Sequence, residues 1–253
     1  MELAGVRIER RIGLGTNRLT HTPGNVAFIK AAVEAGVQMI DTAHLYTGGQ
    51  SEETIGAAAS PAPDGVIVAT KGGFGGAGRG RPDVLHAEIE DSLRKLRTET
   101  IRLYYLHRVD PETPLETSLS AIKDYVDRGK ILHVGVSEVT VEQLERARKV
   151  LPIAAVQNHY NIEERKYDDV VDHCAREGIV FVPFFPLRAA GGPAVAEIAR
   201  RRHATPRQVI LAWLLRRADV MLPIPGTLSL EHLRENLAAE DVKLTKTDLA
   251  ELA

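Results

Sequence analysis

Residues 39–56 read MIDTAHLYTGGQSEETIG, and this stretch indicates how the whole chain is organised. It begins with the end of a short apolar run, after which Asp41 and Tyr46 stand five positions apart. A glycine pair then leads to Ser51 and Glu52, which open a helix-like segment. A carboxylate at a strand end, a phenol beyond it and a loop that enters a helix are typical of a catalytic loop on a rigid scaffold. A turn, a half-buried tyrosine and an ordinary helix start explain the stretch equally well, so the rest of the chain decides.

Length and composition are those of one ordinary globular enzyme. The chain has 253 residues, of which 44% are hydrophobic and 26% are charged. A (β/α)₈ barrel commonly uses about 250 residues for one domain. The single cysteine, Cys174, excludes an intramolecular disulfide, and its surroundings predict a buried helical thiol. We therefore expect one domain over residues 1–253.

Charge and hydropathy exclude several classes of partner. The formal net charge of −2 gives no electrostatic reason to expect nucleic acid or an anionic membrane surface. No apolar run reaches the roughly 18 residues that span a membrane, and the N-terminus lacks the apolar core of a signal peptide. These features predict a cytoplasmic protein in a reducing compartment, as a monomer or weak homo-oligomer.

Short β-type runs alternate with longer helical patterns along the whole chain. Several runs are nearly continuous in Val, Ile and Leu, as parallel strands covered on both faces tend to be. The predicted strands are residues 11–14, 38–40, 66–70, 101–106, 131–136, 154–156, 180–184 and 220–222. The predicted helices are residues 23–35, 82–97, 114–128, a helix opened by Thr140, and residues 166–177, 206–217 and 231–238. Eight strands with following helices predict an α/β fold, the (β/α)₈ TIM barrel.

A doubly wound open sheet is the alternative fold. Its GxGxxG fingerprint should follow the first strand, but the sequence Gly13-Leu14-Gly15-Thr16 is not continued by a third glycine. A barrel gathers its functional side chains at the C-terminal ends of the strands. Candidate residues stand at all eight predicted ends: Thr16 and Asn17; Asp41 and Tyr46; Lys71; His107; Ser137 and Glu138; Gln157 and Asn158; Phe184 and Phe185; and Ile224, Pro225, Gly226 and Thr227. This register favours the barrel and predicts one site at its mouth.

With these residues assembled, the chain resembles the aldo-keto reductase family over residues 13–236. The motifs that carry the resemblance are, in order, IGLGT, MIDTAHLY with SEETIG, the strand end VATK, LYYLHRVD, GKILHVGVSE, VQNHYN and IPGTLSLEHLREN. The resemblance implies a nicotinamide-dependent enzyme that transfers hydride to the carbonyl carbon of a small molecule. It places the family's catalytic tetrad on Asp41, Tyr46, Lys71 and His107, and we call these four residues the tetrad.

The four residue types of the tetrad suit this chemistry. A free phenol has a pKa of about 10 and is a weak acid at neutral pH. We expect Tyr46 to donate the proton and the Lys71 ammonium to favour its phenolate, while Asp41 holds and neutralises Lys71. A neutral His107 would orient the carbonyl group and hydrogen-bond its oxygen.

The resemblance also implies a cofactor, with NADP(H) preferred and NAD(H) possible. The implied contacts are Thr16, Asn17, Asp41, Ser137, Glu138, Gln157, Phe184, Phe185, Pro186, Leu187, Ile224, Pro225, Gly226, Thr227, His232, Glu235 and Asn236. Ser137, Glu138 and Gln157 fall at the nicotinamide carboxamide, and Phe184 falls where a ring stacks on the nicotinamide. The exposed N–H groups of a helix start after Thr227 suit phosphate on general grounds.

Two positions depart from the family pattern in ways that affect cofactor binding. Glu138 replaces a common asparagine, so it accepts hydrogen bonds from the carboxamide but cannot donate them. Gly226 stands where many relatives carry a lysine against the 2′-phosphate. His232 or Arg234 would then have to supply the missing charge, which leaves use of NADH open.

Substrate contacts are predicted at Asn17, His44, Tyr46, Phe74 and His107. Little chain follows the last motif, and the segment after Phe185 is short, which favours an open, shallow mouth. The glycine-rich residues 72–82 are either a mobile surface loop or a substrate lid. In the second case Arg79 or Arg81 would be a handle for an anion.

Three function hypotheses remain, led by an NADPH-dependent carbonyl reductase. The second is a nucleotide-binding, redox-sensing regulatory protein with little turnover, and the complete tetrad argues against it. The third is a barrel aldolase with Lys71 as its Schiff base, but a neighbouring Asp41 would keep that lysine charged. No metal site is expected, because the nine histidines lack ligand spacing. Fold alone does not identify a substrate.

Overall fold

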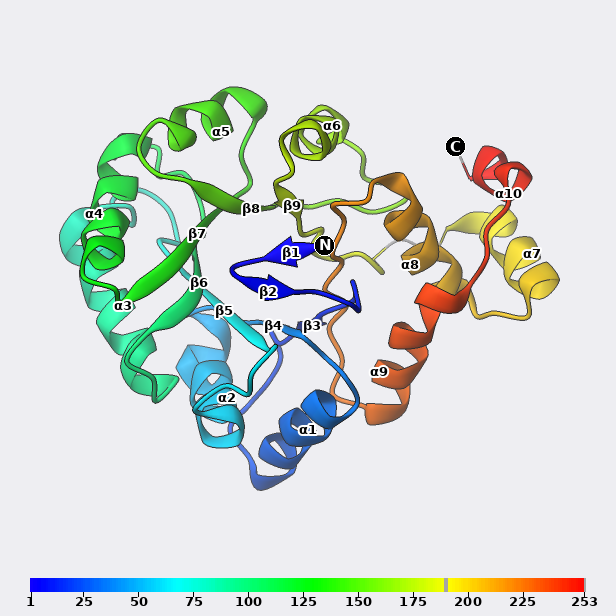
Figure 1. Ribbon diagram of the computed structural model, residues 1–253, viewed down its shortest axis with the longest axis horizontal. Coiled ribbons are helices and arrows are strands. Elements are labelled where there is room, and N and C mark those ends of the chain that lie inside the picture. The colour runs from blue at the N-terminus through cyan, green and yellow to red at the C-terminus, as the bar shows by residue number, and fades with distance from the viewer. Residues whose placement is uncertain (189–190, 253) are drawn as a thin grey trace.

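The computed structural model describes residues 1–188 and 191–252, and a parallel sheet curled into a barrel lies at its centre (Figure 1). Seven strands pair in chain order: β3 (Leu14–Gly15), β4 (Met39–Asp41), β5 (Ile67–Gly72), β6 (Ile101–Leu106), β7 (Ile131–Ser137), β8 (Ile153–Gln157) and β9 (Val180–Phe181). Their pairings are all parallel. The predicted (β/α)₈ barrel is confirmed, and most strands run one or two residues further toward the site than predicted. The exception is β9, which ends at Phe181 and not at the predicted Phe184.

The barrel is closed by an extended segment, residues 220–226, instead of a regular eighth strand. The Leu222 N–H donates to the Phe181 carbonyl at 2.9 Å, and the Gly13 N–H donates to the Pro223 carbonyl at 2.9 Å. The segment therefore contacts both β9 and β3. Pro223 and a second proline two positions on have no N–H to donate, which prevents a regular ladder. The predicted strand at residues 220–222 is reduced to one isolated bridge, between Met221 and Phe181.

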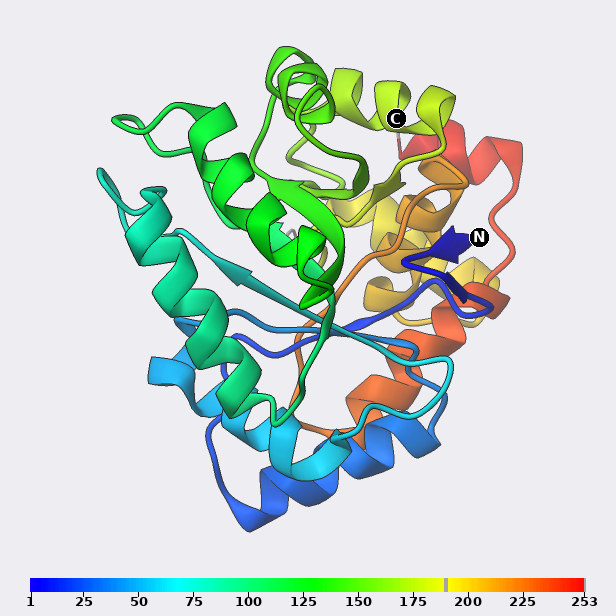
Figure 2. The ribbon, with the colours of Figure 1, turned by 60° about the vertical axis from the view of Figure 1, so that its left-hand side comes forward.

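Helices surround the barrel on its outer side, as the turned view shows (Figure 2). They are α1 (Pro23–Glu34), α2 (Gln50–Ala59), α3 (Pro82–Lys95), α4 (Leu115–Asp127), α5 (Val141–Arg148), α6 (Asp168–Glu177), α7 (Gly192–Arg202), α8 (Pro206–Arg217), α9 (Leu230–Leu237) and α10 (Lys246–Glu251). Short 3₁₀ helices, η1 (Tyr46–Gly49) and η2 (Ala238–Asp241), precede α2 and follow α9. The predicted helices are present, including the capping box in which Thr140 and Gln143 bond reciprocally. The sequence analysis did not predict α7 or α10.

A β-hairpin that the sequence analysis missed closes the N-terminal end of the barrel. Its strands are β1 (Glu2–Leu3) and β2 (Val6–Arg7), and it lies across the barrel opening in Figure 1. Leu3 and Ile8 are each 2% exposed and pack with barrel-interior residues such as Met39. The hairpin therefore acts as an apolar plug.

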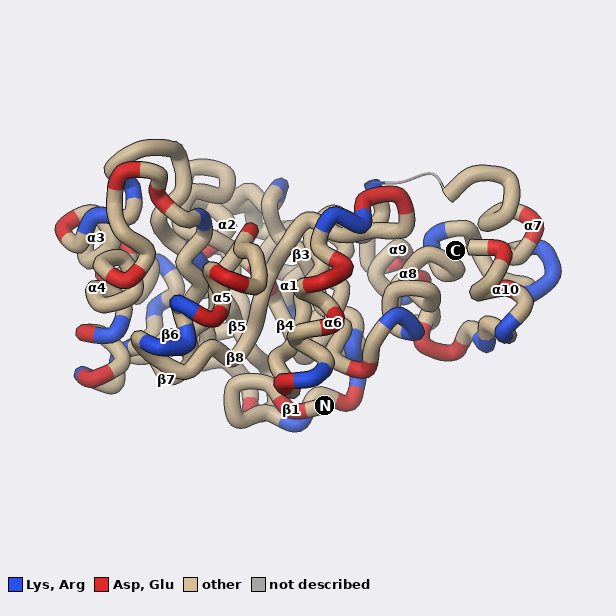
Figure 3. The backbone as a smooth tube through the Cα atoms, turned by 90° about the horizontal axis from the view of Figure 1, so that it is seen from above, with Lys and Arg blue, Asp and Glu red and all other residues tan. Residues whose placement is uncertain are grey.

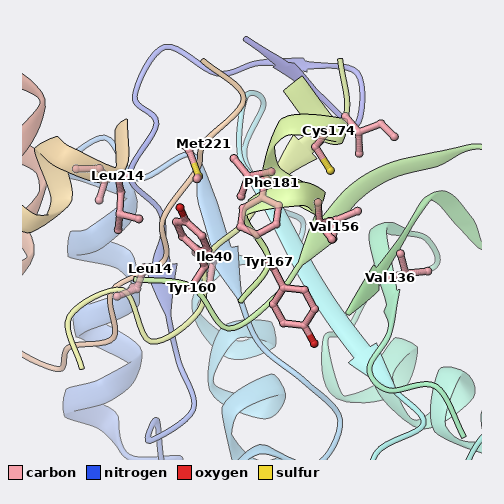
Figure 4. Packing of buried hydrophobic residues seen from close by; sticks show 14 of the residues in the cluster. Leu14, Ile40, Val136, Val156, Tyr160, Tyr167, Cys174, Phe181, Leu214 and Met221 are labelled. Carbon is pink, nitrogen blue, oxygen red and sulfur yellow. The ribbon is translucent and has the colours of Figure 1, made fainter. Parts of the chain in front are cut away.

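A second apolar cluster fills the space between sheet and helices (Figure 4). The Tyr160 ring stacks on Trp213 of α8 at 6.2 Å and meets Phe181 of β9 edge-on at 5.7 Å. Cys174 of α6 lies in this cluster, and burial raises the pKa of its thiol to about 12. The prediction of a buried structural thiol is confirmed.

Helices α7 and α10 lie together at one side of the molecule, beyond α8 (Figures 1 and 3). Arg201 and Arg202 of α7 pair with the buried carboxylate of Asp248 in α10 at 2.8 and 2.6 Å. Basic and acidic residues are interspersed over the helices in Figure 3. Among the described residues, no helix combines the length and the apolar character needed to cross a membrane.

Candidate active site

A buried ion pair lies at the C-terminal ends of β4 and β5. The Lys71 Nζ is 2.6 Å from the Asp41 Oδ1 and donates to the Thr42 carbonyl at 2.6 Å. The other carboxylate oxygen of Asp41 accepts from the Gln157 amide at 2.8 Å. Lys71 is fully buried and Asp41 is 2% exposed. The pair therefore forms one neutral, hydrogen-bonded unit beneath the mouth of the barrel, as buried charges require.

Lys71 keeps its proton in this position. Burial on its own would lower its pKa, but the Asp41 carboxylate and the Tyr46 phenol outweigh burial and raise it. The Nζ lies 5.0 Å from the centroid of the Tyr46 ring. The charge of Lys71 is thus fixed close to Tyr46, and the role that the sequence analysis assigned to this lysine remains a prediction.

Tyr46 and His107 lie side by side above the ion pair. Their ring centroids are 6.0 Å apart, with the rings nearly perpendicular. Burial, with further contributions from Lys71 and Arg108, lowers the pKa of His107 to about 2. Its imidazole is therefore neutral, and among the described residues its Nδ1 has no hydrogen-bond partner. Tyr46 and His107 present a phenol and a neutral ring nitrogen on one side of the pocket.

A small hydroxyl network positions the loop that carries Tyr46. The Ser51 Oγ of α2 lies 2.8 Å from the Thr16 Oγ1 and 2.7 Å from the Thr42 Oγ1. The Thr16 hydroxyl also donates to the Asp41 carbonyl at 2.8 Å. These buried groups connect the ends of β3 and β4 to the first turn of α2. Ser51, the first residue of the motif SEETIG, therefore holds the loop that carries Tyr46 against the ends of β3 and β4.

The tetrad lies at the base of a pocket of 660 Å³, within the size range of small-molecule and cofactor sites. The predicted residues that line it are Thr16, Asn17, Asp41, Tyr46, Phe74, His107, Gln157, Phe184, Phe185, Pro186, Leu187, Ile224, Pro225 and Gly226. They come from the ends of five strands, the closing segment and the glycine-rich loop after β5. Residues predicted at the ends of different strands therefore line one pocket.

Other predicted cofactor residues lie outside the pocket lining. Ser137 is buried beside it and accepts from Arg108, while the Glu138 carboxylate accepts from the His159 N–H at 2.6 Å. Glu235 accepts from the Thr205 hydroxyl at 2.6 Å. Among the rest, Asn236 is buried, Thr227 is half-buried and His232 is exposed. These positions remain predictions, because their side chains do not converge on the tetrad.

The structure places His44 and the glycine-rich loop differently from the predicted substrate wall. The His44 ring is turned to α3, where its Nε2 lies 3.0 Å from Asp91, so it does not line the pocket. Arg79 pairs with Glu88 of α3, and Arg81 pairs with Asp83. Both arginines thus have carboxylate partners. Of the loop, only Phe74 reaches the pocket.

Sequence reasoning missed several residues that line the pocket: Gly15, Arg18, Leu45, Arg108 and Arg188. Arg108 directly follows His107 in the motif LYYLHRVD, so its position beside a tetrad residue was available as a signal. Arg18 donates to the Gly226 carbonyl at 3.5 Å, at the position where the sequence analysis expected a lysine to be missing. The sequence analysis assigned that charge to His232 or Arg234. Among the described residues no cluster of three metal-binding side chains occurs.

A parallel barrel with one pocket above a buried ion pair at the C-terminal ends of its strands has the architecture of the (β/α)₈ barrel enzymes. The model of the Aldo/keto reductase family matches residues 11–192 and 189–253. The chain belongs to the aldo/keto reductase family, an oxidoreductase family.

Named relatives span nearly the whole chain. The chain is 35% identical to pyridoxine 4-dehydrogenase of Escherichia coli K12, over 100% of this chain and 91% of that protein. Among solved structures, the thermostable aldo-keto reductase Tm1743 in complex with epalrestat has a TM-score of 0.90 at 34% identity, covering 100% and 97% of the two chains. An aldo-keto reductase of Klebsiella pneumoniae in complex with NADPH has a TM-score of 0.85 at 29% identity, covering 96% and 89%.

Proposed function

We propose that the protein reduces an aldehyde or ketone to the alcohol, with NADP(H) as the preferred cofactor and NAD(H) as a possible substitute. One observation carries the proposal: a fully buried Lys71 ammonium, paired with Asp41 at 2.6 Å, lies 5.0 Å from the Tyr46 ring. The K. pneumoniae relative was solved with NADPH, which supports the choice of cofactor. The E. coli relative is named a pyridoxine dehydrogenase, so pyridoxal belongs in the first substrate panel.

The pocket residues fit a nicotinamide dinucleotide. Phe184 supplies an aromatic ring near the tetrad, and Arg18 and Arg188 supply cations toward the rim. Helix α9 begins just beyond Gly226, so its first N–H groups are suited to phosphate. We assign the cation near the 2′-phosphate to Arg18, because it approaches Gly226. When bound, the nicotinamide supplies the hydride.

The tetrad residues divide the proton chemistry between them. Tyr46 gives its proton to the oxygen of the carbonyl as negative charge develops there. Lys71 stabilises the resulting phenolate, and Asp41 keeps Lys71 charged and fixed by two anchored oxygens. Neutral His107 orients the carbonyl oxygen toward the phenol. A Schiff-base role for Lys71 is disfavoured, because that chemistry needs an uncharged amine and this lysine has a raised pKa.

Substitution of Tyr46 by phenylalanine tests the assignment. The change removes one hydroxyl that donates the proton, so kcat/KM for a panel of aldehydes should fall by about 10²- to 10⁴-fold. NADPH affinity, measured by quenching of protein fluorescence, should stay within about 2-fold because the ring is retained. Tyr125→Phe is the matched control, since this tyrosine bonds Glu90 on the outer side of the barrel. Near-normal turnover by Tyr46→Phe would refute the proposal.

A titration with NADPH and NADH decides the cofactor. A 2′-phosphate held by one arginine should favour NADPH by about 10- to 100-fold. Arg18→Met should remove most of that preference without changing NADH affinity. A preference that persists in Arg18→Met and disappears in Arg234→Met would instead support the assignment made from the sequence alone.

A further inference from the structure

Arg108 is a half-buried cation inside the pocket that the proposed hydride transfer does not use. Its Nη1 donates to the His107 carbonyl at 2.6 Å and to the Ser137 hydroxyl at 3.0 Å. In the part of the chain that the structure describes, its other guanidinium nitrogens donate no hydrogen bond. Two of the three nitrogens that could grip an anion are therefore free, and the two existing bonds hold the group in place.

The charge of Arg108 also has no ion-pair partner among the described residues. Arg79 pairs with Glu88 and Arg81 pairs with Asp83, whereas Arg108 forms no ion pair within residues 1–188 and 191–252. Glu138 is the largest influence that raises the pKa of Arg108, but its carboxylate is engaged by the His159 N–H and by the Tyr167 hydroxyl. Burial lowers the pKa of Arg108, with Glu138 opposing that effect. A half-buried, uncompensated guanidinium is stabilised by an anion that enters the pocket.

Aromatic rings define the space next to this charge. The guanidinium carbon lies 5.1 Å from the Phe74 ring centroid and 5.6 Å from that of Phe184. The Phe74 ring in turn lies 4.8 Å from the His107 ring. The Phe74 ring therefore lies next to both the Arg108 guanidinium and His107, the residue to which we assign orientation of the carbonyl group. A flat molecule packed against the Phe74 ring would place its carbonyl at His107 and an anionic group at Arg108.

Part of the pocket rim is apolar as well. Leu45, Phe74 and Phe185 are 40%, 40% and 42% exposed, and all three line this one pocket. Large apolar side chains that gather around a hollow mark a binding surface. An aliphatic sugar would leave them against water or against hydroxyl groups, whereas an aromatic ring would cover them.

We propose that Arg108 is a specificity-determining residue that selects aromatic carbonyl compounds carrying a carboxylate or phenolate on the ring. The inference rests on the proposed function for the identity of the carbonyl group, and on Arg108 and the three apolar rim residues for the rest. The planar guanidinium takes an oxyanion with two parallel hydrogen bonds, a geometry that lysine does not reproduce. Arg108 touches no reacting atom in this scheme and acts through substrate binding.

Binding of 3-formylbenzoate and its methyl ester provides the test, because the two compounds share a shape and differ in charge. Calorimetric titration into the protein, alone and with saturating NADP⁺, gives the acid-to-ester affinity ratio without turnover. Wild type should favour the acid by about 10- to 100-fold. Arg108→Met should reduce the ratio to about one, and Arg108→Lys should keep only part of it. Arg128→Met is the matched control, since that arginine packs 4.3 Å from the Tyr125 ring outside the pocket.

The outcomes separate the two proposals. An acid preference that is lost in Arg108→Met and kept in Arg128→Met supports the role of Arg108, whether or not the aldehyde is reduced with NADPH. Equal binding of acid and ester, no binding of either, or a preference that survives in Arg108→Met overturns it. Turnover of both compounds with NADPH is then measured on the same samples. Failure of wild type to reduce either compound would count against the reductase alone.

Discussion

The two open ends of the barrel are filled in different ways, one by apolar side chains and the other by polar groups. At the N-terminal end, the hairpin formed by β1 and β2 fills the opening with Leu3, Ile8 and their apolar neighbours. At the C-terminal end, the opening holds a buried ion pair and a hydrophobic-rimmed pocket. Apolar packing at the first end contributes stability and no chemistry. At the second end the buried charges of Asp41 and Lys71 are paired with each other, and the polar groups around this pair are those to which we assign the chemistry.

The largest effect should follow from removing the charge at the open end. Lys71→Met leaves the Asp41 carboxylate buried without its cation, which should lower the free energy of unfolding by about 3–5 kcal/mol. Turnover should fall by at least about 10²-fold, because the phenolate loses its stabilising charge. Urea unfolding and steady-state kinetics measure the two effects.

The double variant Asp41→Asn with Lys71→Met sharpens that result. Removing both charges should restore part of the lost stability, while turnover stays low. A Lys71→Met protein as stable as wild type would contradict the account of the pair as a coupled unit.

The next effect concerns the closed end, where stability and turnover should separate. Leu3→Ala deletes a side chain that is 2% exposed, so we expect a loss of about 2–5 kcal/mol in the free energy of unfolding. The value of kcat should stay within about 2-fold of wild type at a temperature where the variant is folded. Glu2→Ala, at the exposed neighbouring position, should change stability by less than about 0.5 kcal/mol. A large fall in kcat for folded Leu3→Ala would show that the two ends are not independent.

A third effect depends on pH and again belongs to the open end. Folding holds the pKa of His107 at about 2, whereas the unfolded imidazole takes up a proton below its usual pKa. The unfolded state then binds more protons, so this residue's contribution is complete above about pH 6.5 and declines as the pH falls. The loss is at most about 1.4 kcal/mol per pH unit. His107→Asn should therefore show a shallower decline in urea midpoint than wild type between neutral and acidic pH. If the urea midpoints of wild type and His107→Asn fall in parallel with pH, this account of His107 is refuted.

The smallest effect concerns backbone strain beside the pocket. Glu138 adopts φ +57°, a left-handed conformation that asparagine tolerates better than glutamate. Glu138→Gln and Glu138→Asn both remove the carboxylate charge, but only asparagine relieves the backbone strain. The glutamine variant is therefore the reference for the stability of the asparagine variant. We expect the asparagine variant to be more stable than the glutamine variant by about 0.5–1 kcal/mol in thermal unfolding. Equal stability would show that the local fold, and not the residue type, absorbs the strain.

Strand-end register was the most informative part of the sequence. It predicted the barrel and gathered the tetrad, because parallel strands bring residues distant in the chain to one face. It did not predict the hairpin, since two-residue strands give no periodic signal and the Ala4-Gly5 turn lacks the usual Asn-Gly or Asp-Gly pair. The eighth strand was only partly foreseeable. Its apolar residues were visible, but their prolines interrupt the ladder.

Side-chain direction explains the differences at the site. His44 lies two residues from Thr42 in a loop, and only the fold shows that its ring turns to Asp91 in α3. The sequence analysis considered Arg79 and Arg81 as handles for an anion and overlooked Arg108, although all three are cations near a tetrad residue in the sequence. The difference between them is a carboxylate partner, which arises from the packing of α3 against the glycine-rich loop.

The prolines of the closing segment leave the barrel with a seam. Along residues 220–226 the ring of strands is held by isolated bridges, while ordered ladders run around the rest of the cylinder. Amide protons at such a junction exchange with solvent through smaller openings than those inside a full ladder. Ile224 and Pro225 line the pocket from this seam, so a molecule bound in the pocket would contact the part of the barrel that is held by isolated bridges. Binding of a molecule in the pocket should therefore slow amide exchange along residues 220–226.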